Sequence, residues 1–208
     1  MENVEILKRR LRGSVILIFI IIIFCIMVLI LLNKMVLVKE YYKASDFNIK
    51  TVYSKVDYNK NGIDDYSDFL LGAKKIKGKN SSYEELMIKV FQYAGYNLDK
   101  MVDNYFKDSK DLENKMDRIS LYKSFINDNA TKISINFKKK EEFQPGDFIF
   151  LSEGIGLLSD KRDKNGLNYI IVIENGKVVE KEGLKELDVS GHYRFDSSLI
   201  DDEILKKK

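Results

Sequence analysis

The sequence predicts an α+β domain carried by one N-terminal transmembrane helix. Residues 15–32 are 18 consecutive apolar side chains, which at about 1.5 Å per residue approach the ~30 Å hydrocarbon core of a bilayer. Beyond this run, helical periodicity fills the first half of the chain and short alternating strands fill the second half. This order of helices and then strands predicts helices packed on an antiparallel sheet.

The apolar run also predicts how the N-terminal part of the chain is organised. A spanning segment must be a helix, because lipid offers no partners to backbone polar groups. The run is longer than a secretory apolar region and lacks an Ala-x-Ala site after Leu32, so we expect an uncleaved signal anchor. Four basic residues precede it, and lysines follow it more sparsely, which predicts a cytoplasmic N-terminus. The expected segments are a cytoplasmic basic flank (1–12), a transmembrane anchor (13–38), a juxtamembrane stalk (39–52) and an extracytoplasmic domain (53–205).

Helices are expected in the first half of this domain. Leu86, Met87, Val90, Phe91 and Ala94 keep the spacing of one buried helical face. A serine just before this helix can cap it, and a glycine just after it can end it. The same argument predicts four helices, at about residues 66–73, 84–94, 99–106 and 112–129.

Strands are expected in the second half. Ile133, Ile135 and Phe137 alternate with polar residues, as in a half-buried strand. Asn175-Gly176 is a strong signal for a two-residue hairpin turn. The predicted strands cover residues 132–137, 148–151, 155–158, 169–173, 178–179 and 192–195.

Composition excludes several kinds of chemistry. Cys25 is the only cysteine and falls inside the predicted anchor, so the domain has neither a disulfide nor a thiol nucleophile. His192 is the only histidine, which excludes any site that needs two. The net charge is +3, of which residues 1–12 contribute +2. The remaining +1 gives no electrostatic argument for a nucleic-acid partner.

The segment from Asp57 to Asp68 has the spacing of a calcium-binding loop. Oxygen donors stand at positions 1, 3, 5, 9 and 12, glycine stands at position 6, and position 7 offers a backbone carbonyl. The alternative is an Asn/Asp/Gly turn that caps the following helix. If Ca²⁺ binds, the expected ligands are Asp57, Asn59, Asn61, Ile63, Asp65 and Asp68.

Two other residues have a chemical and a structural interpretation. His192 lies in the last predicted strand, where a single histidine is more often hydrogen-bonded than catalytic. Ser82 lies at a helix N-terminus, where the dipole stabilises negative charge, yet capping is the more common role of such a serine.

Several segments carry a resemblance when they are taken in order: residues 57–72, 94–98, 144–147, 155–162, 165–166 with 169–171, and 191–195. Together they resemble a known bacterial family, the domain of unknown function 1287 (DUF1287), whose members are similar to NlpC-type, papain-like cysteine peptidases of the cell wall. The resemblance covers about residues 53–196 and implies a papain-like fold.

The resemblance implies where catalytic groups would stand. The family's cysteine position corresponds to Tyr83, its base histidine to Gly154, and a further histidine to Val172. None of these residues supplies a thiolate–imidazole pair. We therefore expect a pseudoenzyme whose scaffold is kept and whose catalytic positions are lost.

The leading hypothesis is a membrane-anchored, catalytically inactive domain that acts in binding, regulation or scaffolding at the cell envelope. Its expected partner is a peptidoglycan peptide or an envelope protein, and its candidate groove residues are Ser82, Tyr83, His192 and Arg194. One alternative is a residual hydrolase with Ser82 as nucleophile. The other is a calcium-stabilised extracellular interaction module.

Overall fold

A computed structural model of the chain describes residues 15, 17–30, 41–50, 52, 55–109 and 116–205. The chain divides into two compact units, residues 1–40 and 41–208. In the first unit, Val15 and residues 17–30 are helical, and apolar side chains such as Phe19 and Phe24 are more than half exposed. Among the described residues, no helix combines the length and apolar character needed to cross a bilayer. The predicted anchor also includes residues 13, 14, 16 and 31–38, which lie outside the described residues.

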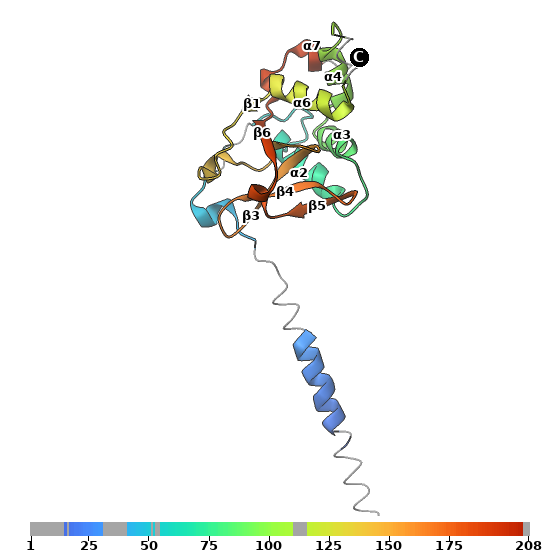
Figure 1. Ribbon diagram of the computed structural model, residues 1–208, viewed down its shortest axis with the longest axis vertical. Helices are drawn as coiled ribbons and strands as arrows, with labels where there is room; N and C mark the ends of the chain where they lie inside the picture. The colour runs from blue at the N-terminus through green and yellow to red at the C-terminus, as the bar shows by residue number, and fades with distance from the viewer. Residues whose placement is uncertain are drawn as a thin grey trace, which may run out of the picture. The chain divides into compact units, whose positions relative to one another are not determined.

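The second unit is an α+β domain, as the sequence predicts (Figure 1). Its described strands form one six-stranded antiparallel sheet in the order β1-β6-β2-β3-β4-β5. The strands are β1 (Thr131–Lys132), β2 (Phe148–Leu151), β3 (Ile155–Arg162), β4 (Asn168–Glu174), β5 (Lys177–Lys181) and β6 (Val189–Arg194). The helices are α2 (Asp65–Lys75), α3 (Tyr83–Tyr93), α4 (Leu98–Tyr105), α6 (Arg118–Asn129) and α7 (Asp202–Leu205), with short 3-10 turns η1 (Ala44–Phe47), η2 (Lys140–Glu142), η3 (Leu184–Glu186) and η4 (Ser197–Leu199).

The two faces of the sheet bury two separate apolar clusters. Phe148 and Phe150 of β2 point into the larger cluster, among the apolar faces of α2, α3, α4 and α6. Ile149 and Leu151, the alternate residues of the same strand, belong to a smaller cluster with Phe143 and Leu184. This period of two is the alternation that places successive side chains on opposite faces.

The helices follow their predicted positions closely. α3 starts after Ser82, whose Oγ accepts a hydrogen bond from the backbone N–H of Glu85 at 3.1 Å. Asn97 caps α4 and Asp117 caps α6 in the same way. Asp117 sets the start of α6 at Arg118, whereas the sequence predicts a start near residue 112; residues 110–115 lie outside the described part of the chain.

The first predicted strand is wrong over most of its length. Residues 132–137 alternate in polarity, yet β1 contains only Thr131 and Lys132, paired with Arg194 and Tyr193. Ile135 is 37% exposed, and only Phe137, at the end of the segment, packs against the smaller apolar cluster. Alternation indicates a strand only where one face is buried.

The predicted hairpin turn at Asn175-Gly176 is confirmed. Both residues have positive φ, 51° and 72°, as a type I′ turn requires. The backbone N–H of Ser81 donates to the carbonyl of Gly176 at 2.9 Å, and Val178 exchanges backbone hydrogen bonds with Gly78 and Lys79. The β4–β5 hairpin therefore holds the segment that leads into α3.

Candidate functional site

The candidate site begins at the N-terminus of α3. Ser82 is exposed and its Oγ caps the helix. Tyr83, the first helical residue, is half-buried against the smaller apolar cluster, and its hydroxyl donates to the carbonyl of Ile173 at 3.2 Å. Burial raises the pKa of Tyr83, as do the carboxylates of Glu153 and Glu174. The phenol is therefore neutral at physiological pH.

Gly154 lies directly beneath the ring of Tyr83. A Cβ atom added at Gly154 would lie 2.2 Å from Cγ of Tyr83, with two further ring atoms at 2.4 and 2.5 Å. Real Cβ atoms do not approach other atoms so closely, so the ring occupies the space that any side chain at residue 154 would need.

Val172 lies in the same region. It belongs to the smaller apolar cluster against which Tyr83 packs, and it precedes Ile173, whose carbonyl accepts the Tyr83 hydrogen bond. The fold thus brings Tyr83, Gly154 and Val172 together from α3, the β2–β3 turn and β4. None of these three residues carries a thiol or an imidazole.

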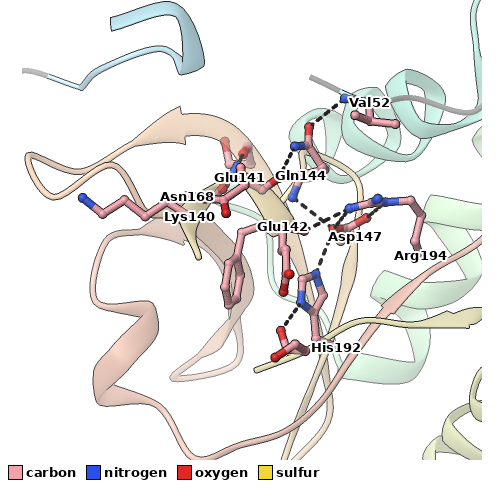
Figure 2. A network of polar contacts seen from close by, with 12 residues as sticks. Val52, Lys140, Glu141, Glu142, Gln144, Asp147, Asn168, His192 and Arg194 are labelled. Carbon is pink, nitrogen blue, oxygen red and sulfur yellow. Dashed lines mark hydrogen bonds and ion pairs between the residues drawn. The ribbon is translucent and has the colours of Figure 1, made fainter. Parts of the chain in front are cut away.

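His192 and Arg194 belong to a different group of residues, centred on Asp147 (Figure 2). His192 and Asp147 are almost fully buried. Asp147 accepts from Nε and Nη2 of Arg194, both at 2.8 Å, and its Oδ2 lies 2.8 Å from Nε2 of His192. Nδ1 of His192 faces the carbonyl of Ser134 at 3.3 Å, and the ring stacks on Phe143 at a centroid distance of 4.7 Å.

This network also fixes the chain on either side of Asp147. The backbone N–H of Gln144 donates to Asp147 at 3.0 Å, and Arg194 donates to the carbonyl of Glu142 at 3.0 Å. The Gln144 side chain in turn contacts the backbone of Lys50, Val52 and Glu141. All of these contacts lie within the domain, so the network is an internal brace.

The four predicted groove residues therefore form two groups rather than one. Ser82 and Tyr83 lie at the start of α3, whereas His192 and Arg194 converge on Asp147. The hydrogen bonds of His192 run to Asp147 and Ser134, and those of Ser82 run within the first turn of its own helix.

Asp147 is the residue that sequence reasoning missed. It appears in the sequence as the last residue of the Gln144-Pro145-Gly146-Asp147 turn, and turn aspartates are usually solvated. The available signal is its place immediately before β2, whose four residues are all buried. An acid at the start of a fully buried strand needs partners, and the histidine and arginine of β6 provide them.

The loop from Asp57 to Asp68 forms a tight turn with an internal set of hydrogen bonds. The Asp57 carboxylate accepts from the backbone N–H groups of Asn61 and Gly62 at 3.1 and 2.8 Å. Both carboxylate oxygens of Asp65 are also engaged, one by the backbone N–H of Tyr58 at 2.9 Å and the other by the hydroxyl of Tyr96. Within the described part of the chain, no group of three or more His, Cys, Asp or Glu side chains is placed to hold a metal ion.

An opening lies between α4 and α7. Its volume is about 730 Å³, and it is lined by lysine, carboxylate and amide side chains with Tyr105 and Ile204. Two of the lining charges, Lys107 and Glu203, pair with each other at 3.8 Å.

Comparison with known proteins identifies a family. No curated protein and no solved structure matches this chain. Residues 79–195, more than half of the 208 residues, match the family model described as "Domain of unknown function (DUF1287)". The match contains α3, the sheet, Tyr83, Gly154, Val172 and the Asp147 network, whereas the Asp57–Asp68 loop precedes it. The chain belongs to the DUF1287 family.

Proposed function

We propose that this protein is a membrane-anchored, non-catalytic member of its family that acts at the cell envelope by binding. The resemblance to NlpC-type peptidases belongs to this proposal. Its expected partner is a peptidoglycan peptide or an active envelope relative. The observation that carries it is the packing of the Tyr83 ring over Gly154.

This packing supports a non-catalytic role because Tyr83 and Gly154 fit each other in size: the ring of one fills the space left by the missing side chain of the other. In an NlpC-like enzyme these positions hold the nucleophile and its base. Here the residue at one position fills the space that the other would need, so a single substitution does not restore the site. The family's catalytic residues are missing at all three positions, while the sheet and the core around them are intact. This combination favours a domain that acts by binding a partner.

The apolar run of the sequence supports the anchor, whereas no helix among the described residues is long and apolar enough to cross a bilayer. The apolar run of 18 residues approaches the thickness of a bilayer core. The helical residues 17–30 expose their large apolar side chains, and such a surface is stable in lipid rather than in water. The basic flank at residues 8–12 favours an extracytoplasmic domain.

Mass spectrometry of muropeptides tests the catalytic part of the proposal. The full-length chain in detergent micelles is incubated with muropeptides beside a cysteine-bearing member of the family. We expect no cleavage by this protein and cleavage by the control. Cleavage that disappears in Ser82→Ala would contradict the proposal and establish the residual hydrolase.

A restored variant tests whether the three positions form one site. Tyr83→Cys, Gly154→His and Val172→His are combined, so that the ring is removed as the histidines are introduced. We expect muropeptide cleavage by the triple variant and none by Gly154→His alone, because Tyr83 still fills the site.

Calorimetric titration of muropeptides into the wild type measures binding. The absence of binding would count against a peptide partner.

A further inference from the structure

The segment from Asp57 to Asp68 gathers negative charge. Four aspartates, Asp57, Asp64, Asp65 and Asp68, fall within 12 residues. Burial raises the pKa of Asp65, and the neighbouring carboxylates of Asp57 and Asp68 raise it further. The carboxylates of Asp57 and Asp68 thus each act on Asp65. No lysine or arginine among the described residues forms an ion pair with any of them.

Asp68 carries the strongest evidence for a missing partner. Its side chain is fully buried. One carboxylate oxygen, Oδ2, accepts from the amide groups of Asn59 and Asn61, both at 2.9 Å. The other oxygen, Oδ1, is buried and has no hydrogen-bond partner within the described part of the chain. A buried carboxylate with an unsatisfied oxygen is costly unless a charge of opposite sign compensates it.

The two asparagines of the loop carry further oxygens, although it is their amide N–H groups that face Asp68. Oδ1 of Asn59 accepts from the backbone N–H of Asn61 at 2.9 Å, and Oδ1 of Asn61 accepts from that of Ile63 at 2.8 Å. Each amide oxygen keeps a second lone pair. The side-chain oxygens of this loop thus belong to both carboxylates and amides.

Asp65 has a different role from the one that the loop spacing predicts. Its two oxygens hold Tyr58 and Tyr96, whose rings stack at a centroid distance of 4.3 Å. It fixes the loop against the rest of the domain, and we assign it to positioning rather than to ligation.

We propose that this loop binds one calcium ion through side-chain oxygens of Asp57, Asn59, Asn61 and Asp68. The preference for calcium follows from the donors, since a flexible set of carboxylate and amide oxygens suits its large, variable coordination shell. Magnesium instead demands a strict octahedron and retains its waters. This site is independent of the proposed envelope function.

The bound ion would join two parts of the domain. Asn59 donates to the carbonyl of Tyr93 at the end of α3 at 3.3 Å. A Cβ at Gly95 would lie 2.6 Å from Cβ of Asn59, so the loop packs tightly on the turn between α3 and α4. Asp68 itself belongs to α2. The ion therefore ties the start of α2 to the end of α3.

Thermal unfolding of the full-length chain in detergent micelles tests the site. The protein is first treated with a chelator, and calcium is then added to about 100 times its Kd. We expect the Tm to rise by about 5 °C or more, and to rise less with the same concentration of magnesium. Asp68→Asn should abolish the shift. Asp160→Asn, which changes an exposed aspartate on β3, should keep it.

Terbium luminescence provides a second measurement that does not depend on stability. The chain contains no tryptophan, so Tyr58 in the loop is the expected sensitiser of a bound Tb³⁺ ion. We expect emission from the wild type that calcium displaces. If Asp68→Asn does not fold, Asp57→Asn serves for both measurements. An unchanged Tm together with no sensitised emission from the wild type would overturn the proposal, as would an equal response in the variant.

Discussion

Gly154 and Tyr83 are matched in size, because the absence of a side chain at one makes room for the ring of the other. Gly154 has no positive φ, so nothing in its backbone requires glycine. The requirement comes from the tyrosine alone, and the two residues should be energetically coupled.

A double-mutant cycle measures this coupling. Gly154→Ala in the wild type forces the ring of Tyr83 to move and should reduce the free energy of unfolding by about 1–3 kcal/mol. In a Tyr83→Ala background the same change should cost much less. Urea denaturation of the four proteins gives the coupling energy, and an equal cost in both backgrounds would show that the ring is not the obstacle.

Glu180 of β5 is a buried acid held by three donors. Lys161 and Lys77 contact its Oε2 at 2.8 and 2.6 Å, and Ser159 donates to its Oε1 at 2.5 Å. Its side chain is 2% exposed. Burial opposes ionisation, but the two lysines and the serine prevail and lower the pKa of Glu180 to about 2.

The lowered pKa predicts a dependence of stability on pH. Because the pKa in the folded state lies below the usual 4.5, this carboxylate stabilises the fold fully above about pH 4.5. The contribution is lost as the pH falls towards about 2. Glu180→Gln should cost about 1–3 kcal/mol at pH 7, and the difference from wild type should shrink below pH 4.

Denaturation at pH 7, 4 and 2.5 checks this expectation. Glu174→Gln is the matched control, since Glu174 also pairs with a lysine, Lys181, but its side chain is 47% exposed. Exposed pairs contribute little. A loss at pH 7 as large in the control as in Glu180→Gln would contradict the assigned role.

At the scale of elements, α3 is positioned by its cap and by the β4–β5 hairpin. Substitutions of Ser82 distinguish its role as a helix cap from a role as a nucleophile. Ser82→Ala should cost about 1 kcal/mol of stability, because the N–H of Glu85 loses its acceptor. Ser82→Asp should restore that stability, because aspartate caps a helix as well as serine does. The same variant lacks the hydroxyl that the residual-hydrolase hypothesis requires. Thermal denaturation of both variants decides, and equal losses in the two would contradict the capping role.

Most of these elements were predictable, because each has a local cause. Periodicity predicts α3, and Asn175-Gly176 predicts the β4–β5 turn. The end of β1 at Lys132 was not predictable, because the exposure of Ile135 is set by the packing of the whole domain. The Asp147 network was not predictable either, since residues 147, 192 and 194 meet only through the pairing of β2 with β6.

The contact between Tyr83 and Gly154 also could not be predicted from the sequence. The sequence indicates that catalytic residues are absent, but not that the replacements touch, because 71 positions separate 83 from 154. The meeting of a helix N-terminus with a strand turn is set by the whole core.

At the scale of the whole molecule, the predicted topology is open to a direct test. Cys25 is the only cysteine and lies within the predicted span, so introduced cysteines report on their own positions. Glu203→Cys should be labelled by a membrane-impermeant maleimide in intact cells, whereas Glu5→Cys should be labelled only after lysis. Labelling of both in intact cells, or of neither, would contradict a single span with the domain outside.

The two edges of the sheet limit how the domain associates with its neighbours. On one edge, β1 has only two residues. On the other, backbone groups of Gly176 and Val178 are already bonded to residues 78–81. Anchored copies would be crowded in the plane of a membrane, where open strand edges promote aggregation. A short strand on one edge and a partly bonded strand on the other disfavour the joining of two sheets edge to edge.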